Sequence, residues 1–111
     1  MAMEKLGHIC QGTNMAATLE KKVKDKVRKI LDELGAYYFF PATGGYGRSG
    51  VPDVVGCYNG MFFGIECKAG KGTTTALQDR ELQRIKDAGG IALVVNENNV
   101  EEVKSILEQQ R

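Results

Sequence analysis

The sequence has few of the residues on which disulfide-linked proteins, zinc proteins and histidine-based enzymes depend. It has no tryptophan, one histidine and three cysteines among its 111 residues. The cysteines, Cys10, Cys57 and Cys67, include no C-x-x-C pair, so the spacing indicates neither a disulfide framework nor a zinc site. We therefore expect a reducing intracellular compartment. With His8 as the only histidine, a mechanism based on histidine has almost nothing to use.

Long apolar runs and an excess of one charge are also missing. The longest apolar stretches, such as 36–40 and 91–95, are far too short to cross a bilayer, so we expect no signal peptide, no membrane span and a cytoplasmic location. The formal net charge is only +1, which argues against a strongly basic DNA-packaging protein. Apolar residues make up 42% and charged residues 26%, which is typical of a folded globular domain rather than a disordered chain.

The length suits one hydrophobic core. We expect residues 1–18 to form an N-terminal arm and residues 19–111 to form a single domain. Apolar residues recur at helical spacing from Leu19 to Leu34, with Thr18 placed as an N-cap and Gly35 as a C-terminal stop. This pattern predicts the first helix of the domain.

Beyond that helix, short apolar segments alternate with glycine-rich turns. Strands are predicted over 36–40, 52–58, 61–68 and 91–95, the last of them buried on both faces. Asn59-Gly60 predicts a two-residue type I′ hairpin, and Thr75 with Gln78 forms a capping box that opens a helix. Asn98 or Asn99 can cap a last helix. The resulting order, α-β-β-β-α-β-α, predicts an α/β domain with a mixed sheet.

The predicted hairpin brings two acidic residues together. A turn at Asn59-Gly60 pairs Tyr58 with Met61 and, continuing outward, Asp53 with Glu66. Opposed residues have Cβ atoms about 4.5–5.5 Å apart, where like charges are destabilising. Lys68, on the same face, could offset part of this repulsion, and a divalent cation such as Mg²⁺ could offset more. A solvated acidic cluster on a surface hairpin is the alternative.

A third acidic residue faces inward on the first helix. At about 100° per residue, Glu20 lies within roughly 20° of Val27 and Leu31 around the helix axis. It therefore lies on the apolar side of the helix. Two interpretations stay open: Glu20 is a third metal ligand, or it is only a favourable charge near the helix N-terminus.

These residues carry a resemblance to a known family. Gly50-Val51-Pro52-Asp53 followed by Gly64-Ile65-Glu66-Cys67-Lys68-Ala69 resembles the PD-(D/E)XK nuclease signature. With the helix start at Thr75–Gln78 and the turn Ala88-Gly89-Gly90, the chain is similar to the VRR-NUC (virus-type replication-repair nuclease) family over about residues 19–95. The resemblance implies a restriction-endonuclease-like α-β-β-β-α-β core, here with an extra C-terminal helix.

The resemblance also implies an active site. It assigns Mg²⁺ or Mn²⁺ to the side chains of Glu20, Asp53 and Glu66 and to the backbone carbonyl of Cys67, a position where the family often has an aliphatic residue. Lys68 becomes the catalytic lysine, and Gln78 becomes the glutamine that orients the metal site or touches phosphate. The alternative for Gln78 is that it only closes the capping box.

The activity implied by the resemblance is metal-dependent cleavage of DNA by a homodimer of phage or bacterial type, on branched DNA such as Holliday junctions. Residues proposed to contact the DNA backbone are Arg48, Ser49, Lys71, Lys21, Lys22 and Lys24. Candidate apolar surface for dimer formation is the run Tyr37–Phe40 and the stripe of Val100, Val103, Ile106 and Leu107; the alternative is that both segments only fill the core. A non-catalytic nucleic-acid-binding or assembly module with the same fold is the alternative function.

Overall fold

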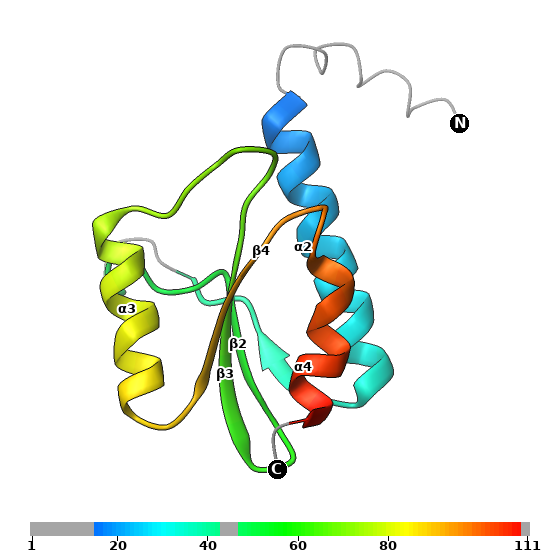
Figure 1. Ribbon diagram of the computed structural model, residues 1–111, viewed down its shortest axis with the longest axis vertical. Helices are drawn as coiled ribbons and strands as arrows, with labels where there is room; N and C mark the ends of the chain where they lie inside the picture. The colour runs from blue at the N-terminus through cyan, green and yellow to red at the C-terminus, as the bar shows by residue number, and fades with distance from the viewer. Residues whose placement is uncertain (1–14, 43–46, 110–111) are drawn as a thin grey trace.

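The computed structural model describes residues 15–42 and 47–109 (Figure 1). The elements in chain order are α2 (Met15–Leu34), β1 (Tyr37–Phe39), β2 (Val54–Tyr58), β3 (Met61–Cys67), α3 (Ala76–Asp87), β4 (Ile91–Val95), the 3₁₀ turn η2 (Val100–Glu102) and α4 (Val103–Gln109). This order confirms the predicted α-β-β-β-α-β-α arrangement and the restriction-endonuclease-like α/β fold. Most of the predicted arm, residues 1–14, lies outside the described residues.

The four strands form one mixed sheet in the order β1-β2-β3-β4. Strands β1, β2 and β3 are antiparallel neighbours, whereas β4 runs parallel to β3. Helices α2 and α4 lie side by side on one face of the sheet, and α3 covers the other face (Figure 1). None of the helices described in residues 15–42 and 47–109 is long and apolar enough to cross a membrane.

The main core lies between the sheet and the pair α2 and α4. Phe63 and Ile65 of β3 are fully buried there. Their core neighbours from the helices and η2 include Val23, Val27, Ile30, Leu31, Val100, Val103 and Leu107. Val100, Val103 and Leu107 of the predicted stripe are therefore core, as the second interpretation expected, and their use as a free dimer surface is wrong. The reason is that η2 and α4 pack against α2, which buries these three side chains and leaves Ile106 half-buried.

The first helix begins earlier than predicted. It starts at Met15, so Thr18 lies within the helix and is not its N-cap. Alanine has the highest helix propensity, and Ala16 and Ala17 extend the helix toward the N-terminus. The predicted C-terminal stop is confirmed: Gly35 has φ +76°, and the N–H groups of Gly35 and Ala36 donate to Asp32 and Leu31 carbonyls at 3.1 Å.

The hairpin forms in the predicted register. Asn59 and Gly60 have φ values of 52° and 80°, as a type I′ turn requires, and the pairs run from Tyr58↔Met61 to Val54↔Ile65. Because successive strand residues alternate between faces, this register decides which side chains of β2 and β3 share a face.

The last strand and the last helix differ from expectation in detail. Val94 of β4 is 42% exposed, so the strand is not buried on both faces. Helix α3 packs against Gly64 and Gly90 through Ile85 and leaves Val94 uncovered. At the start of η2, Asn99 makes no side-chain capping bond, and its Oδ1 instead accepts from the Asn96 N–H at 2.7 Å.

Candidate functional site

Asp53 and Glu66 lie together at one end of the central hairpin. Asp53 directly precedes β2, and Glu66 is the next-to-last residue of β3. The observed register, continued by one position, places the two residues opposite each other. The Cys67 N–H donates to Asp53 Oδ2 at 2.8 Å, which ties the start of one strand to the end of the other. The hairpin thus holds two acidic side chains side by side.

Glu66 is a buried carboxylate with one engaged oxygen and one free oxygen. The residue is only 2% exposed. Its Oε2 accepts from Gln78 Nε2 at 2.9 Å and lies 3.4 Å from Lys68 Nζ, whereas Oε1 is buried without a hydrogen-bond partner. Burial, and then the charge of Asp53, raise the pKa of Glu66 to about 7. A buried oxygen without a partner is costly unless something binds it.

Gln78 both closes the capping box and contacts Glu66. Its side-chain Oε1 accepts from the Thr75 backbone N–H at 2.9 Å, and its backbone N–H donates to Thr75 Oγ1 at 3.2 Å. These two bonds complete the capping box of α3. Its Nε2 remains available and donates to Glu66. The two interpretations are therefore compatible, because the amide has a separate acceptor and donor.

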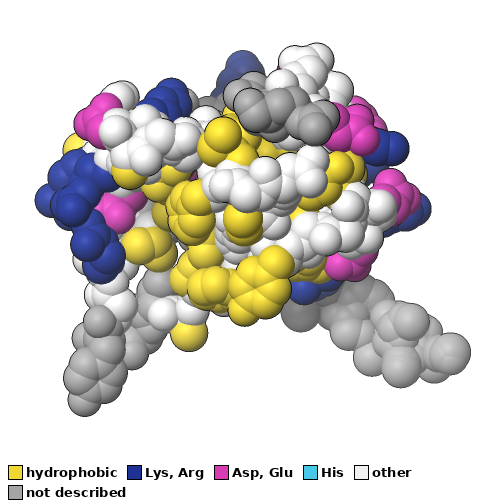
Figure 2. All heavy atoms as spheres, turned by 90° about the horizontal axis from the view of Figure 1, so that it is seen from below, with side chains coloured by type: hydrophobic (Ala, Val, Ile, Leu, Met, Phe, Trp, Pro, Cys, Tyr) yellow, Lys and Arg dark blue, Asp and Glu magenta, His cyan; other side chains and the backbone are white. Residues whose placement is uncertain are grey.

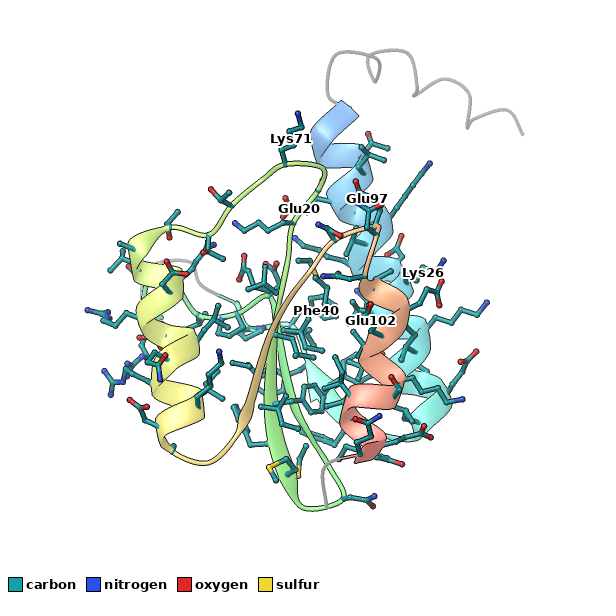
Figure 3. All side chains as sticks on the ribbon, viewed as in Figure 1. Glu20, Lys26, Phe40, Lys71, Glu97 and Glu102 are labelled. Carbon is teal, nitrogen blue, oxygen red and sulfur yellow. The ribbon has the colours of Figure 1, made fainter. Side chains whose placement is uncertain are left out.

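Glu20 approaches the hairpin from α2. Its side chain is 37% exposed, and its Oε2 lies 3.7 Å from Lys24 Nζ, which in turn lies 3.8 Å from Asp53 Oδ1. The charge of Glu20 is also a minor cause of the raised pKa of Glu66. In Figure 3, Glu20 extends from α2 on the side that faces the sheet. The helix therefore directs this acid toward the other two.

Glu20, Asp53 and Glu66 lie near one another but are not arranged as three ligands of one metal ion. Across residues 15–42 and 47–109, no group of three or more His, Cys, Asp or Glu side chains has the geometry to hold a metal ion. The hairpin pairs Asp53 with Glu66, and Glu20 joins them through the ammonium group of Lys24. All the acids supply oxygen, which suits a hard divalent cation better than zinc.

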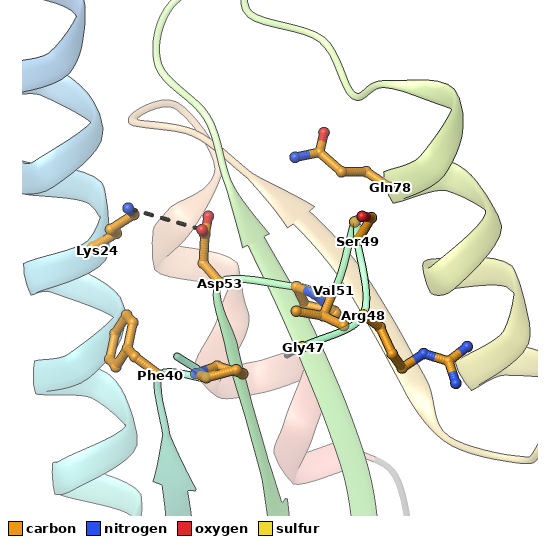
Figure 4. Close-up of a pocket in the computed structure, with 11 residues that line it drawn as sticks. Lys24, Phe40, Gly47, Arg48, Ser49, Val51, Asp53 and Gln78 are labelled. Atoms are coloured by element: carbon orange, nitrogen blue, oxygen red, sulfur yellow. Dashed lines mark ion pairs between the residues drawn. The ribbon is translucent and has the colours of Figure 1, made fainter. Parts of the chain in front are cut away.

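A pocket of about 560 Å³ opens beside Asp53 (Figure 4). Its walls come from α2, from the segment after β1, from the loop before β2 and from the first turn of α3. The lining residues are Lys24, Phe40, Pro41, Gly47, Arg48, Ser49, Gly50, Val51, Pro52, Asp53 and Gln78. The pocket thus includes Asp53 at the foot of β2, Gln78 of α3 and the predicted DNA-contacting residues Lys24, Arg48 and Ser49, whereas Glu66 lies outside its lining.

Comparison with known proteins gives a match at the level of structure. No protein-family model matches the sequence, and no curated protein matches it significantly. A solved structure described as "VRR_NUC domain" superposes with a TM-score of 0.62 and 21% sequence identity, over 83% of this chain and 97% of that chain. This chain has the fold of a VRR_NUC domain. At 21% identity the comparison shows the fold alone, so any activity has to be argued from the side chains of this chain.

In this VRR_NUC fold, the loop before Asp53 is fastened to α3 by an ion pair that sequence reasoning missed. Arg48 donates through Nε and Nη2 to the two carboxylate oxygens of Glu81 at 3.2 and 2.9 Å, and Glu81 is buried. Gly50, at φ +82°, passes so close to α3 that a Cβ there would lie 2.6 Å from Leu77 backbone atoms. Glu81 follows Gln78 by three residues on the helix, a spacing that could have indicated it.

The remaining predicted DNA contacts are spread over the surface. Lys21 is paired with Asp25 at 3.1 Å on the exposed side of α2, and Lys22 is also exposed. Lys71 lies in the loop after β3, at the same end of the molecule as Glu20 (Figure 3). Glu97, also missed from the sequence, holds this loop by accepting from the Gly70 N–H at 3.0 and 3.1 Å. The structure thus brings Lys24, Arg48 and Ser49 to the pocket and leaves Lys21 and Lys22 outside its lining.

The Cys67 side chain is a buried thiol rather than an exposed reactive one. It is fully buried, and burial, followed by the charges of Asp53 and Glu66, raises the pKa of its thiol to about 12. The thiol therefore stays protonated and packs as a small apolar group.

Proposed function

We propose that this chain is a Mg²⁺- or Mn²⁺-dependent nuclease that hydrolyses phosphodiester bonds in DNA. One observation carries the proposal: Glu66, opposite Asp53, is a buried carboxylate whose Oε2 lies 3.4 Å from Lys68 Nζ and whose Oε1 has no hydrogen-bond partner. Such an arrangement is costly for a purely structural residue, because burial and like charge both oppose ionisation. A divalent cation would offset that cost.

The donor set fits a hard cation. Asp53 and Glu66 would hold the ion, with Glu20 and the Cys67 backbone carbonyl as further ligands. A bound Mg²⁺ or Mn²⁺ supplies an activated water and neutralises charge on the phosphate and the leaving oxygen. The positions of Asp53 and Glu66 would therefore set where on the protein the phosphodiester bond is cleaved.

Two further side chains complete the proposed mechanism. Lys68 follows Glu66 by two residues, so its ammonium shares the face of the hairpin on which the acids lie. We assign it the role of orienting the attacking water and adding positive charge where the transition state gains negative charge. Gln78, through its bond to Glu66 Oε2, would keep the carboxylate turned so that the buried Oε1 is left without a hydrogen-bond partner and can bind the ion.

The proposed substrate is branched DNA, bound by a homodimer. Tyr37 and Phe39 of the edge strand β1 are 72% and 51% exposed, and Phe62 of β3 is 46% exposed. Seen from the hairpin end, hydrophobic side chains gather at the centre of the surface, between charged flanks (Figure 2). Two-fold pairing through this surface would give two sites per assembly, which suits the symmetric strands of a four-way junction.

The competing function is a nucleic-acid-binding or assembly module without catalysis. Such a module has no need for a buried carboxylate that has a lysine at one oxygen and no hydrogen-bond partner at the other, so Glu66 and Lys68 favour the enzyme. The test is to incubate the purified chain with linear, flapped and four-way-junction DNA in Mg²⁺, in Mn²⁺ and in EDTA. We expect cleavage only with metal.

The matched variants are Asp53→Asn and Glu66→Gln, which keep the size of each side chain and remove its charge. We expect both variants to fold and to lose cleavage by about a thousandfold or more, the scale of a group that acts directly on the reaction. Cleavage at wild-type rates in either variant would refute the assignment. DNA binding without cleavage in any metal would support the module.

A further inference from the structure

Lys24 lies between two of the three acidic side chains. Its Nζ is 3.7 Å from Glu20 Oε2, one helical turn earlier on α2, and 3.8 Å from Asp53 Oδ1, on the hairpin. Figure 4 shows the ammonium group extending from α2 toward the Asp53 carboxylate. Lys68 occupies the corresponding position beside Glu66. Each acid of the site therefore has a lysine as its counter-ion.

The oxygen of Asp53 that faces Lys24 is also the one left for a metal. Asp53 Oδ2 already accepts the Cys67 N–H at 2.8 Å, whereas the partner of Oδ1 among residues 15–42 and 47–109 is the distant ammonium of Lys24 at 3.8 Å. A divalent cation shared by Asp53 and Glu20 would need the same region of space as the Lys24 ammonium, because both attract the same carboxylate oxygens. Metal and Lys24 therefore compete.

The contacts of Lys24 are weak enough to be exchanged. Both distances exceed the roughly 2.7–2.9 Å of a well-formed charged hydrogen bond. The side chain is 34% exposed, so water screens the attraction. It also lines the 560 Å³ pocket beside Asp53, into which its flexible stem can turn. An anionic phosphate in that pocket would be a better partner for the ammonium once a metal has neutralised the acids.

We propose that Lys24 is an exchangeable counter-ion: it neutralises Glu20 and Asp53 in the metal-free protein and is released by the bound metal to hold a DNA phosphate in the adjoining pocket. This inference rests on the proposed metal-dependent nuclease function. It gives Lys24 two successive anionic partners and couples metal binding to DNA binding.

The first experiment measures metal affinity without DNA. Mn²⁺ binding is followed by isothermal titration calorimetry for wild type, Lys24→Met, Lys24→Arg and Lys29→Met. Lys29 is an exposed lysine about 140° away around the same helix, so Lys29→Met removes one charge without touching the acids. We expect Lys24→Met to bind Mn²⁺ about three- to tenfold more tightly than wild type, because the competing cation is gone. Lys24→Arg and Lys29→Met should bind like wild type.

The second experiment measures DNA affinity against salt, in EDTA and in Ca²⁺, a hard cation with the same preference for oxygen. One additional phosphate contact steepens the dependence of log K on log salt concentration by about 0.9. We expect Ca²⁺ to steepen the slope by about this amount in wild type and Lys29→Met, and not in Lys24→Met.

The outcomes separate this inference from the function on which it rests. Equal Mn²⁺ affinity of Lys24→Met and Lys29→Met would overturn the role of Lys24 as a counter-ion. If the wild-type chain still cleaved DNA only with metal, the proposed nuclease function would be unaffected. Equal salt slopes of wild type and Lys24→Met in Ca²⁺ would overturn its phosphate contact. Absence of Mn²⁺ binding in wild type would overturn both the inference and the proposed function.

Discussion

Gln78 donates its side-chain amide to Glu66 at 2.9 Å while its carbonyl oxygen accepts the Thr75 N–H at the same distance. One side chain therefore closes the N-terminus of α3 and orients the buried carboxylate of the candidate site. The start of the helix cannot shift along the chain without moving the partner of Glu66.

The two roles of Gln78 can be separated by substitution. Thr75→Ala removes only the Oγ1 acceptor of the capping box, so we expect a loss of about 1 kcal/mol in unfolding free energy and cleavage within about twofold of wild type. Gln78→Ala removes the other capping-box acceptor, Oε1, together with the donor to Glu66, so we expect cleavage to fall by about tenfold or more. Urea unfolding and single-turnover cleavage measure the two effects. Parallel losses in both variants would show that Gln78 is only a cap.

The raised pKa of Glu66 predicts a pH-dependent stability of the metal-free protein. The ordinary value is 4.5 and the folded value is about 7, so the unfolded chain ionises first as the pH rises. We therefore expect the contribution of Glu66 to stability to be highest below pH 4.5, to decline as the pH rises through 7 and then to be lower by about 3 kcal/mol. In EDTA, we expect Glu66→Gln to be more stable than wild type at pH 8 and equal to it at pH 4. A wild-type chain at least as stable as the variant at pH 8 would contradict this prediction.

Lys68 should affect turnover more than metal affinity. Its ammonium lies 3.4 Å from Glu66 Oε2, and we assign it to the reacting water rather than to the ion. We expect Lys68→Ala to lower kcat by about a hundredfold or more, with Mn²⁺ affinity unchanged or tighter. Calorimetry and single-turnover kinetics measure the two quantities. Unaltered turnover would remove Lys68 from the site.

The Arg48–Glu81 pair should stabilise the loop before Asp53. Arg48→Met leaves the buried Glu81 carboxylate without its two-bond partner, whereas Arg80→Met removes only a contact of 3.6 Å. We expect a lower Tm for Arg48→Met than for Arg80→Met at pH 7. Arg48 lowers the pKa of Glu81, so this stabilisation is present above pH 4.5 and is lost as the pH falls further. The difference in Tm should therefore shrink at pH 3, and equal Tm values at pH 7 would refute the role of the pair.

The exposed aromatic side chains of β1 should control assembly. Phe39→Glu places a charge on the proposed dimer surface, and Leu77→Glu places one on a comparably exposed apolar residue at the start of α3. We expect light scattering at micromolar concentration to show a dimer for wild type and Leu77→Glu and a monomer for Phe39→Glu. A monomeric wild type would overturn the homodimer and leave the nuclease chemistry unaffected.

Much of the fold is determined by local patterns in the sequence. Asn59-Gly60 selects a type I′ turn because both residues accept positive φ, and the period of two along each strand then places Asp53 opposite Glu66. Gly35 ends α2 and Thr75 begins α3 for equally local reasons. Local rules failed at Thr18, where helix-forming alanines carried α2 back to Met15, and at Val94, whose exposure depends on where α3 packs.

The sequence by itself therefore determined the order of the elements, the hairpin register and the pairing of Asp53 with Glu66, because turn chemistry and side-chain periodicity act over a few residues. Only the tertiary structure decided that Gln78 reaches Glu66, that Lys24 lies between Glu20 and Asp53, and that Glu81 holds Arg48. Each of these contacts spans different elements, and their relative placement follows from packing α2 and α3 on opposite faces of the sheet, which no local pattern encodes.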